Sequence, residues 1–184
     1  MSPHVILAGF MGTGKTSVGR RVAQTLGRTF VDTDALVESS AGRSVTEVFA
    51  TDGEARFRAM ERDAIARACA MPDAVIAIGG GALTDAESRR RLMVAGPVIC
   101  LRAAPEDILS RVGDASSRPL LAGIHGESED AARARRLARI RALLDERAAT
   151  YALATHQLDT SGLSVDEVAE RVCTLVTAAL VEID

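Results

Sequence analysis

The sequence predicts a doubly wound α/β fold, in which helices cover both faces of a parallel sheet. Two observations carry this prediction. Five short segments of strand type, the last of them weaker, alternate with segments of helical periodicity, and a glycine-rich loop lies between the first strand and the first helix. No internal repeat or linker divides the 184 residues. We therefore expect a single domain, 1–184, with one sizeable core.

The glycine-rich loop fits the phosphate-binding motif G-x-x-x-x-G-K-[ST] without exception. A strand at 5–8 precedes the loop GFMGTGKT at 9–16, and the helix that follows ends at Gly27, a C-capping glycine. Backbone N–H groups at such a helix N-terminus converge on an anion. We expect Lys15 to reach the β- and γ-phosphates and the Thr16 hydroxyl to ligate Mg²⁺. Lys15 is the single lysine among 22 basic residues, which argues against a chance glycine-rich turn.

Two carboxylates, Asp32 and Asp34, follow the second predicted strand at 29–31. The C-terminal ends of strands border the ligand crevice in an open parallel sheet. Acidic groups at this place suit the Mg²⁺ chemistry of phosphoryl transfer. The alternative is that Asp34 caps the helix that begins at Ala35. We favour a site, because the phosphate-binding loop occupies the end of the first strand.

The next helices carry a second group of charges. A capping box at 44–47 predicts a short helix, and a longer helix follows over 53–70. Arg58 in the longer helix has Glu54 at i−4 and Glu61 at i+3. From spacing alone, these three residues form a surface salt-bridge set of small energetic value.

The third strand, 74–78, is apolar throughout, as a strand covered on both faces should be. Gly79, Gly80 and Gly81 follow it directly. They form either a loose turn or a place where a ligand meets bare backbone N–H groups. The remaining predicted elements are a helix opened by a capping box at 84–87, a strand at 98–101, a helix from Pro105 to Arg111, an arginine-rich helix over 128–150, a weak strand at 156–159 and a last helix capped by 164–167.

The segment from about 112 to 126 has no periodicity and is rich in Gly, Ser, Asp and Pro. A connection of this length inside a compact domain suggests a mobile lid. Closure of a lid in a phosphoryl-transfer enzyme brings an arginine over the γ-phosphate and excludes water. Arg118 is the candidate for that arginine.

Composition excludes several other classes of protein. The net charge of −3 argues against a general nucleic-acid binder. No apolar run approaches the roughly 18 residues of a membrane span, and the first strand leaves no room for a signal peptide, so we expect a cytoplasmic protein without membrane contact. The three cysteines are widely spaced, and this pattern predicts buried thiols rather than metal ligands.

Six motifs in order resemble those of the shikimate kinase family. They are GFMGTGKT (9–16), DTD (32–34), GEARFRAME (53–61), GGG (79–81), RPLL (118–121) and the R-x-x-x-Y of Arg147 and Tyr151. The resemblance covers nearly the whole chain. It implies a monomeric enzyme that uses Mg²⁺ and ATP to phosphorylate the 3-hydroxyl of shikimate in aromatic amino-acid biosynthesis. It also implies a P-loop sheet in strand order 2-3-1-4-5, as in nucleoside monophosphate kinases.

The resemblance also implies roles for individual residues. The substrate-binding set is Asp34, Arg58, Gly79, Gly80, Gly81 and Arg147, which reverses the interpretation of Arg58 from spacing. The nucleotide-binding set is Gly12, Thr13, Gly14, Lys15, Thr16, Ser17, Arg111 and Arg118, with Arg111 against adenine. The metal set is Thr16 and Asp32, and the catalytic set is Lys15, Asp34 and Arg118.

This chain departs from the family pattern in two places. Residues 148–150 lack a proline that many members carry, and residues 161–164 lack a basic nucleotide contact found in some members. Two rival interpretations stay open. One is a gluconate-type or nucleotide kinase of the same architecture, and the other is a non-catalytic module, which would be expected to have lost Lys15, Thr16 or Asp34.

Overall fold

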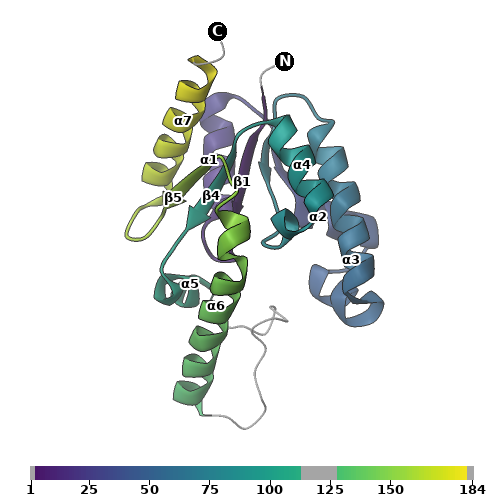
Figure 1. Cartoon of the computed structure of the whole chain (residues 1–184), viewed down its shortest axis with the longest axis vertical. Helices are drawn as coiled ribbons and strands as arrows, with labels where there is room; N and C mark the ends of the chain where they lie inside the picture. Colours follow the sequence, from purple (N-terminus) through teal and green to yellow (C-terminus); the bar gives the residue numbers. More distant parts are fainter. Residues whose placement is uncertain (1–2, 113–127, 182–184) are drawn as a thin grey trace.

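The protein is described by a computed structural model, which covers residues 3–112 and 128–181 (Figure 1). Its centre is a sheet of five strands in the order β2-β3-β1-β4-β5, with parallel pairing throughout. The strands are β1 (Val5–Gly9), β2 (Phe30–Asp32), β3 (Val75–Ala77), β4 (Val98–Arg102) and β5 (His156–Asp159). The predicted strand order and the α/β class are confirmed.

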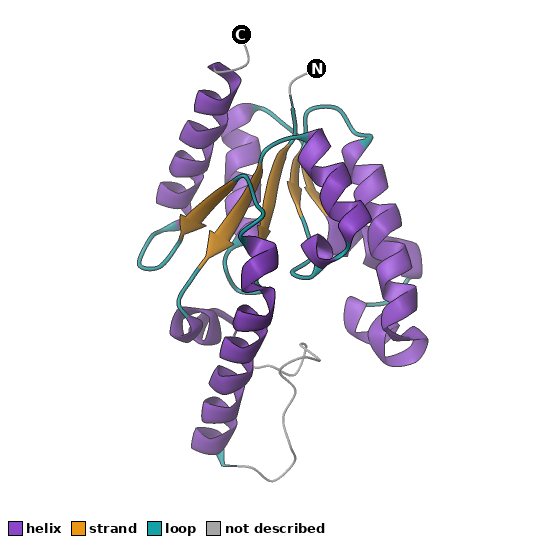
Figure 2. Ribbon diagram, viewed as in Figure 1, coloured by secondary structure: helices purple, strands orange, loops and turns teal. Residues whose placement is uncertain are grey.

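Helices lie on both sides of this sheet (Figure 2). They are α1 (Lys15–Leu26), α2 (Thr33–Ala41), α3 (Val45–Cys69), α4 (Ala86–Ala95), α5 (Pro105–Val112), α6 (Glu129–Tyr151) and α7 (Val165–Val181), with a short 3-10 helix, η1 (Ala82–Thr84). The lid predicted at about 112–126 falls, except for Val112, outside the described residues. Among the described helices, none combines the length and the apolar character that crossing a membrane requires.

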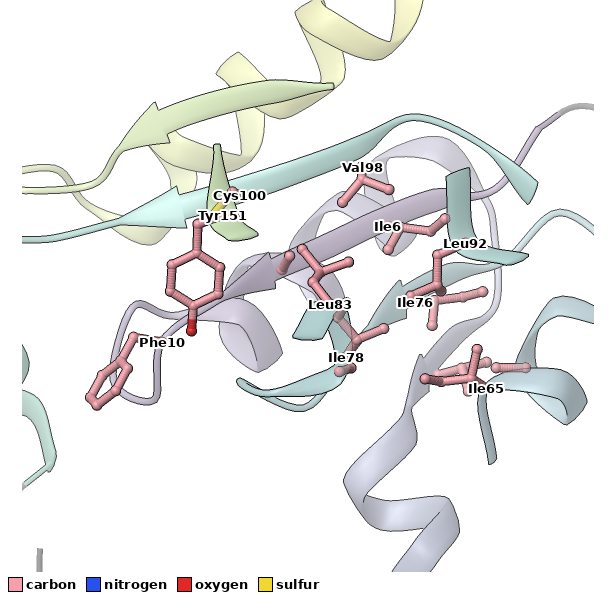
Figure 3. Close-up of a cluster of buried hydrophobic side chains, with 14 of the residues drawn as sticks. Ile6, Phe10, Ile65, Ile76, Ile78, Leu83, Leu92, Val98, Cys100 and Tyr151 are labelled. Carbon is pink, nitrogen blue, oxygen red and sulfur yellow. The ribbon is translucent and has the colours of Figure 1, made fainter. Parts of the chain in front are cut away.

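Alternation along the strands creates two separate hydrophobic layers. Val5 and Leu7 of β1 pack with α1 and α7 on one face, whereas Ile6 and Ala8 point to the other face. On that second face, side chains from α3, α4, α5 and α6 complete the core. Figure 3 shows part of it, including Ile65. Both faces of the sheet are thus covered, which explains the continuous apolar character of the central strands.

The helix boundaries differ from the prediction at several points. Ser44 caps α3 through the predicted capping box, but α3 continues through Gly53 with a kink, where φ is 80° and ψ is 172°. Asp85, not Thr84, caps α4, and its side chain accepts a hydrogen bond from Ser88 N at 2.8 Å. The predicted box placed the cap one residue early because Thr84 belongs to η1 and donates its hydroxyl to Gly81.

The thiols only partly follow the prediction. Cys100 on β4 is buried, whereas Cys69 and Cys173 are half-buried. All three are free. Burial raises the pKa of the Cys100 thiol to about 11, so this side chain is a neutral member of the core at physiological pH.

Candidate active site

The loop between β1 and α1 is built for close approach of an anion. Gly12 and Gly14 have φ values of 78° and 96°, in the left-handed region where residues with a Cβ are disfavoured. Gly14 occupies the N-cap position of α1, and no side chain caps this end of the helix. Residues 12–17, which include the first turn of α1, line the cavity described below, and a helix N-terminus favours an anion there.

Lys15 folds back over the loop from which it starts. Its Nζ atom donates hydrogen bonds to the carbonyl oxygens of Gly9 at 2.9 Å and Phe10 at 3.0 Å. The ammonium group is thereby held beside the end of β1, where the loop begins. A compact cation at this position complements phosphate oxygens bound by the loop.

Thr16 at the start of α1 contacts Asp32 at the end of β2. The Thr16 hydroxyl donates to Asp32 Oδ2 at 3.0 Å, and Asp32 Oδ1 accepts from the backbone N–H of Asp34, also at 3.0 Å. Asp32 is therefore the N-cap of α2, and Asp34, the alternative cap in the sequence prediction, lies in the first turn.

The two oxygens fit a magnesium site. Mg²⁺ takes few protein ligands and fills the remaining positions with water and phosphate oxygens. Among the described residues there is no group of three acidic, histidine or cysteine side chains that would form a complete metal cage. A hydroxyl and a carboxylate beside a phosphate-binding loop match this preference for few ligands.

One cavity of about 1110 Å³ joins this loop to the ends of β2 and β3. Charged side chains of both signs line it: Lys15, Asp32, Asp34, Glu38, Arg58, Glu61, Arg111 and Arg147. Gly79, Gly80 and Gly81, together called the triglycine loop below, form part of its wall. The structure thus brings together all the predicted site residues that it describes, whereas Arg118 lies outside the described residues.

Arg58 is only partly the surface residue that its spacing indicates. Its pair with the exposed Glu54, at 3.3 Å, is a surface contact. Its pair with Glu61, at 2.7 Å, involves a carboxylate whose side chain is 2% exposed. Burial raises the pKa of Glu61, while the hydrogen bond and charge of Arg58 oppose the shift. The buried Glu61 carboxylate therefore anchors Arg58, and the prediction of a surface salt-bridge set holds for Glu54 but was wrong for Glu61.

The triglycine loop is held by side chains from several elements. Gly79 N–H donates to the Thr33 hydroxyl at 3.2 Å, and the Gly81 carbonyl accepts from the Thr84 hydroxyl at 2.6 Å. A Cβ at Gly81 would lie 2.8 Å from both terminal nitrogens of Arg58. A side chain at position 81 would therefore displace the guanidinium group from its place against the triglycine loop.

Arg147 enters the cavity from the last turns of α6. Its Nη1 atom donates to the carbonyl of Gly80 at 3.2 Å, and its guanidinium lies 5.6 Å from the centre of the Phe10 ring. Two guanidinium groups, from α3 and α6, thus converge on the triglycine loop. This arrangement suits a planar anion such as a carboxylate.

Arg111 lines another part of the same cavity, together with Thr160. It donates to the hydroxyl and the carbonyl oxygen of Thr160, both at 3.2 Å. Leu163, Val165 and Val168 add apolar side chains to the cavity lining. Around Ser164 the chain forms a helix cap: the Ser164 hydroxyl and N–H both donate to Glu167.

Four residues that line the cavity or hold its wall in place were not predicted from the sequence. Thr33 stands between two carboxylates and gave no separate signal. Glu61 was recognised only as a partner of Arg58. Phe49 and Phe57 stack with centroids 4.4 Å apart and line the cavity, but in the sequence they are indistinguishable from core residues of α3.

The fold and this cavity define a class: a P-loop kinase that acts on a small molecule. A family model described as "Shikimate kinase" matches residues 11–177. The chain is 43% identical to the shikimate kinase of Caldanaerobacter subterraneus over 169 residues, which is 92% of this chain and 93% of that one. It belongs to the shikimate kinase family.

Solved structures agree with this assignment. The shikimate kinase from Acinetobacter baumannii in complex with shikimate superposes with a TM-score of 0.86 and 31% identity, over 97% of this chain and 95% of that one. A gluconokinase from Sinorhizobium meliloti has a TM-score of 0.59 at 17% identity, over 98% and 95% of the two chains. The second likeness concerns the fold alone.

Proposed function

We propose that this chain transfers the γ-phosphoryl group of ATP to the 3-hydroxyl of shikimate, giving shikimate 3-phosphate and ADP. The observation that carries the proposal is the cavity of about 1110 Å³, which is lined by a phosphate-binding loop, by the guanidinium groups of Arg58 and Arg147 and by the carboxylate of Asp34. Family membership supports the same activity. One relative was solved in complex with shikimate, which is a small polyhydroxy carboxylate.

The acceptor end provides groups that match each part of such a substrate. Arg58 and Arg147 would bind the carboxylate, because planar guanidinium groups pair with carboxylates through two parallel hydrogen bonds. Asp34 would accept hydrogen bonds from the ring hydroxyls and orient the attacking oxygen. Since the transition state of phosphoryl transfer is loose, this orientation contributes more than proton removal does.

The nucleotide end neutralises the charge of the transferring group. Lys15 would exchange the carbonyl oxygens of Gly9 and Phe10 for phosphate oxygens, with the N–H groups of residues 12–17 around them. Thr16 and Asp32 would hold Mg²⁺, which when bound neutralises phosphate charge. Arg111 would lie against the adenine.

Several wider features belong to the same proposal. The enzyme would be a monomeric, cytoplasmic protein made of one kinase domain, 1–184, and would have no nucleic-acid or membrane partner. The lid at about 112–126 and the role of Arg118 over the γ-phosphate stay predictions from the sequence, because residues 113–127 lie outside the described part of the chain.

A coupled ADP-release assay tests the activity directly. Mg²⁺ and ATP would be supplied with shikimate, gluconate or a nucleoside monophosphate in parallel reactions. We expect rapid turnover with shikimate alone, and a loss of kcat by orders of magnitude in the variant Lys15→Met with the fold retained. Preferred turnover of another acceptor would refute the substrate. ATP binding without any turnover would refute catalysis and favour a binding module.

A further inference from the structure

The carbonyl oxygen of Gly80 accepts two hydrogen bonds from the same helix. The Tyr151 hydroxyl donates to it at 2.7 Å, and Arg147 Nη1 donates at 3.2 Å. The two donors lie four residues apart on α6 and therefore share one face. Their common acceptor is the middle of the triglycine loop, so α6 fixes this loop at its centre.

Tyr151 makes the shorter bond from a rigid position. The residue is 8% exposed and belongs to the hydrophobic core beside β4. In Figure 3 its ring extends from the vicinity of Cys100, with the hydroxyl at the end of the ring that points away from that residue. Burial raises the pKa of Tyr151, so the hydroxyl remains a proton donor throughout the neutral range.

Arg147 makes the longer bond and has other donors to offer. Its guanidinium is half-buried, lies over the Phe10 ring and lines the cavity. A guanidinium carries five N–H donors in a fixed plane. A bidentate bond to a carboxylate in the cavity would use two of them, and their plane would then be set by the ligand rather than by Gly80.

We propose that Tyr151 is a positioning residue of the acceptor site: its hydroxyl holds the Gly80 carbonyl, so that Arg147 can turn toward the acceptor carboxylate without leaving that carbonyl unpaired. This inference rests on the proposed function. A partly buried carbonyl that loses both donors destabilises the state in which Arg147 has turned away. Tyr151 would thus favour the substrate-bound arrangement while touching no substrate atom.

The variant Tyr151→Phe removes the donor and keeps the ring. Loss of one such hydrogen bond changes an equilibrium about three- to tenfold. We therefore expect KM for shikimate to rise by about three- to tenfold, with kcat and KM for ATP within about twofold of the parent protein. A purely structural tyrosine would instead lower the melting temperature and leave both KM values unchanged, which would overturn the proposal.

Two further measurements test the route through Arg147. In an Arg147→Ala background, Tyr151→Phe should have no additional effect on KM for shikimate, because the group that it assists is gone. The methyl ester of shikimate, which lacks the anionic carboxylate, should bind the parent and the Tyr151→Phe variant equally. Additive effects, or the same penalty with the ester, would refute the role assigned to Arg147.

Thr155 supplies a matched control. Its hydroxyl accepts the N–H of Val98 at 3.1 Å, at the start of β4 and away from the cavity lining. Thr155→Val removes one hydroxyl that bonds to the backbone, as Tyr151→Phe does. It should lower the melting temperature without changing either KM. A rise in KM for shikimate equal to that of Tyr151→Phe would mean that any loss of stability weakens binding, and would overturn the proposal.

The unaltered protein allows a test that needs no variant. The chain has one tyrosine and no tryptophan, so tyrosine emission reports on Tyr151 alone. Saturating shikimate should change this emission, because Arg147 then leaves the Gly80 carbonyl that it shares with the Tyr151 hydroxyl. Gluconate should leave the emission unchanged. An unchanged signal in a protein that turns over shikimate would overturn the inference, while absence of turnover would refute the proposed function itself.

Discussion

Replacing Gly79 by alanine tests whether the side-chain carboxylates of Asp34 and Glu61 are held in place. A Cβ at this position would lie 2.6 Å from Glu61 Oε1 and 2.9 Å from Asp34 Oδ1. To reach ordinary contact at 3.4 Å, the two oxygens would have to retreat by about 0.8 and 0.5 Å. Glu61 is 1% exposed and bonded to Arg58. We therefore expect much of the movement to fall on Asp34 and the triglycine loop.

A shift of about 1 Å in a positioning group costs about a hundredfold in rate, so a shift of half that size should lower kcat for shikimate by about tenfold. Overpacking should also reduce the free energy of unfolding by about 1–2 kcal/mol. Gly79 does not have a left-handed backbone, so the contact alone is tested. Steady-state kinetics and thermal unfolding measure the two effects.

Gly27→Ala is the matched control. Gly27 has φ of 64° and no atom within 4 Å of a built Cβ. Its replacement should cost about 1 kcal/mol through backbone strain alone and leave the kinetics unchanged. If Gly79→Ala keeps kcat within twofold of the parent protein, the two carboxylates yield freely, and the assignment of Asp34 as a fixed orienting group is refuted.

Three more predictions follow from the charged residues and the tyrosine. Arg58→Ala should chiefly raise KM for shikimate, by tenfold or more because a charge-assisted pair is lost; an unchanged KM would mean that Arg58 only serves its bonds to Glu54 and Glu61. An amine-directed reagent should modify a single lysine, Lys15, with loss of activity and with protection by ATP, as peptide mass spectrometry would detect; full activity after complete modification would refute its phosphate role. In an ultraviolet pH titration, Tyr151 should ionise above the usual value of 10, because burial raises its pKa. Since the folded-state pKa is the higher one, the stability linked to this group is complete below pH 10 and is lost as the pH rises through the folded-state pKa.

The sequence predicted the sheet well because its first four strands are short, largely apolar and bounded by clear breaks. The fifth strand was expected at 156–159, where the structure has it. The kink at Gly53 falls where the helical pattern was predicted to restart. Local sequence signals were enough in both cases, since strand-type segments and glycines act through the chain close to them.

Contacts between distant segments could not be predicted in the same way. The bond between Thr33 and Gly79 joins residues 46 positions apart, and that between Tyr151 and Gly80 joins residues 71 apart. No local sequence pattern around Thr33 or Tyr151 indicates which distant residue its hydroxyl contacts. The burial of Glu61 depends equally on how α3 packs against the sheet, and so its spacing from Arg58 alone gave the wrong environment.

Asp32 shows why a helix cap and a metal ligand need not be competing interpretations. Its Oδ1 atom accepts the N–H of Asp34 at the start of α2, while Oδ2 accepts the Thr16 hydroxyl at the start of α1. One carboxylate therefore spans two helix N-termini, and the cap fixes the direction of the oxygen that faces the phosphate-binding loop. A ligand oriented before the metal arrives loses little conformational entropy when it binds. The cap thus serves the proposed metal site, although the sequence prediction had considered Asp34 rather than Asp32 as the cap.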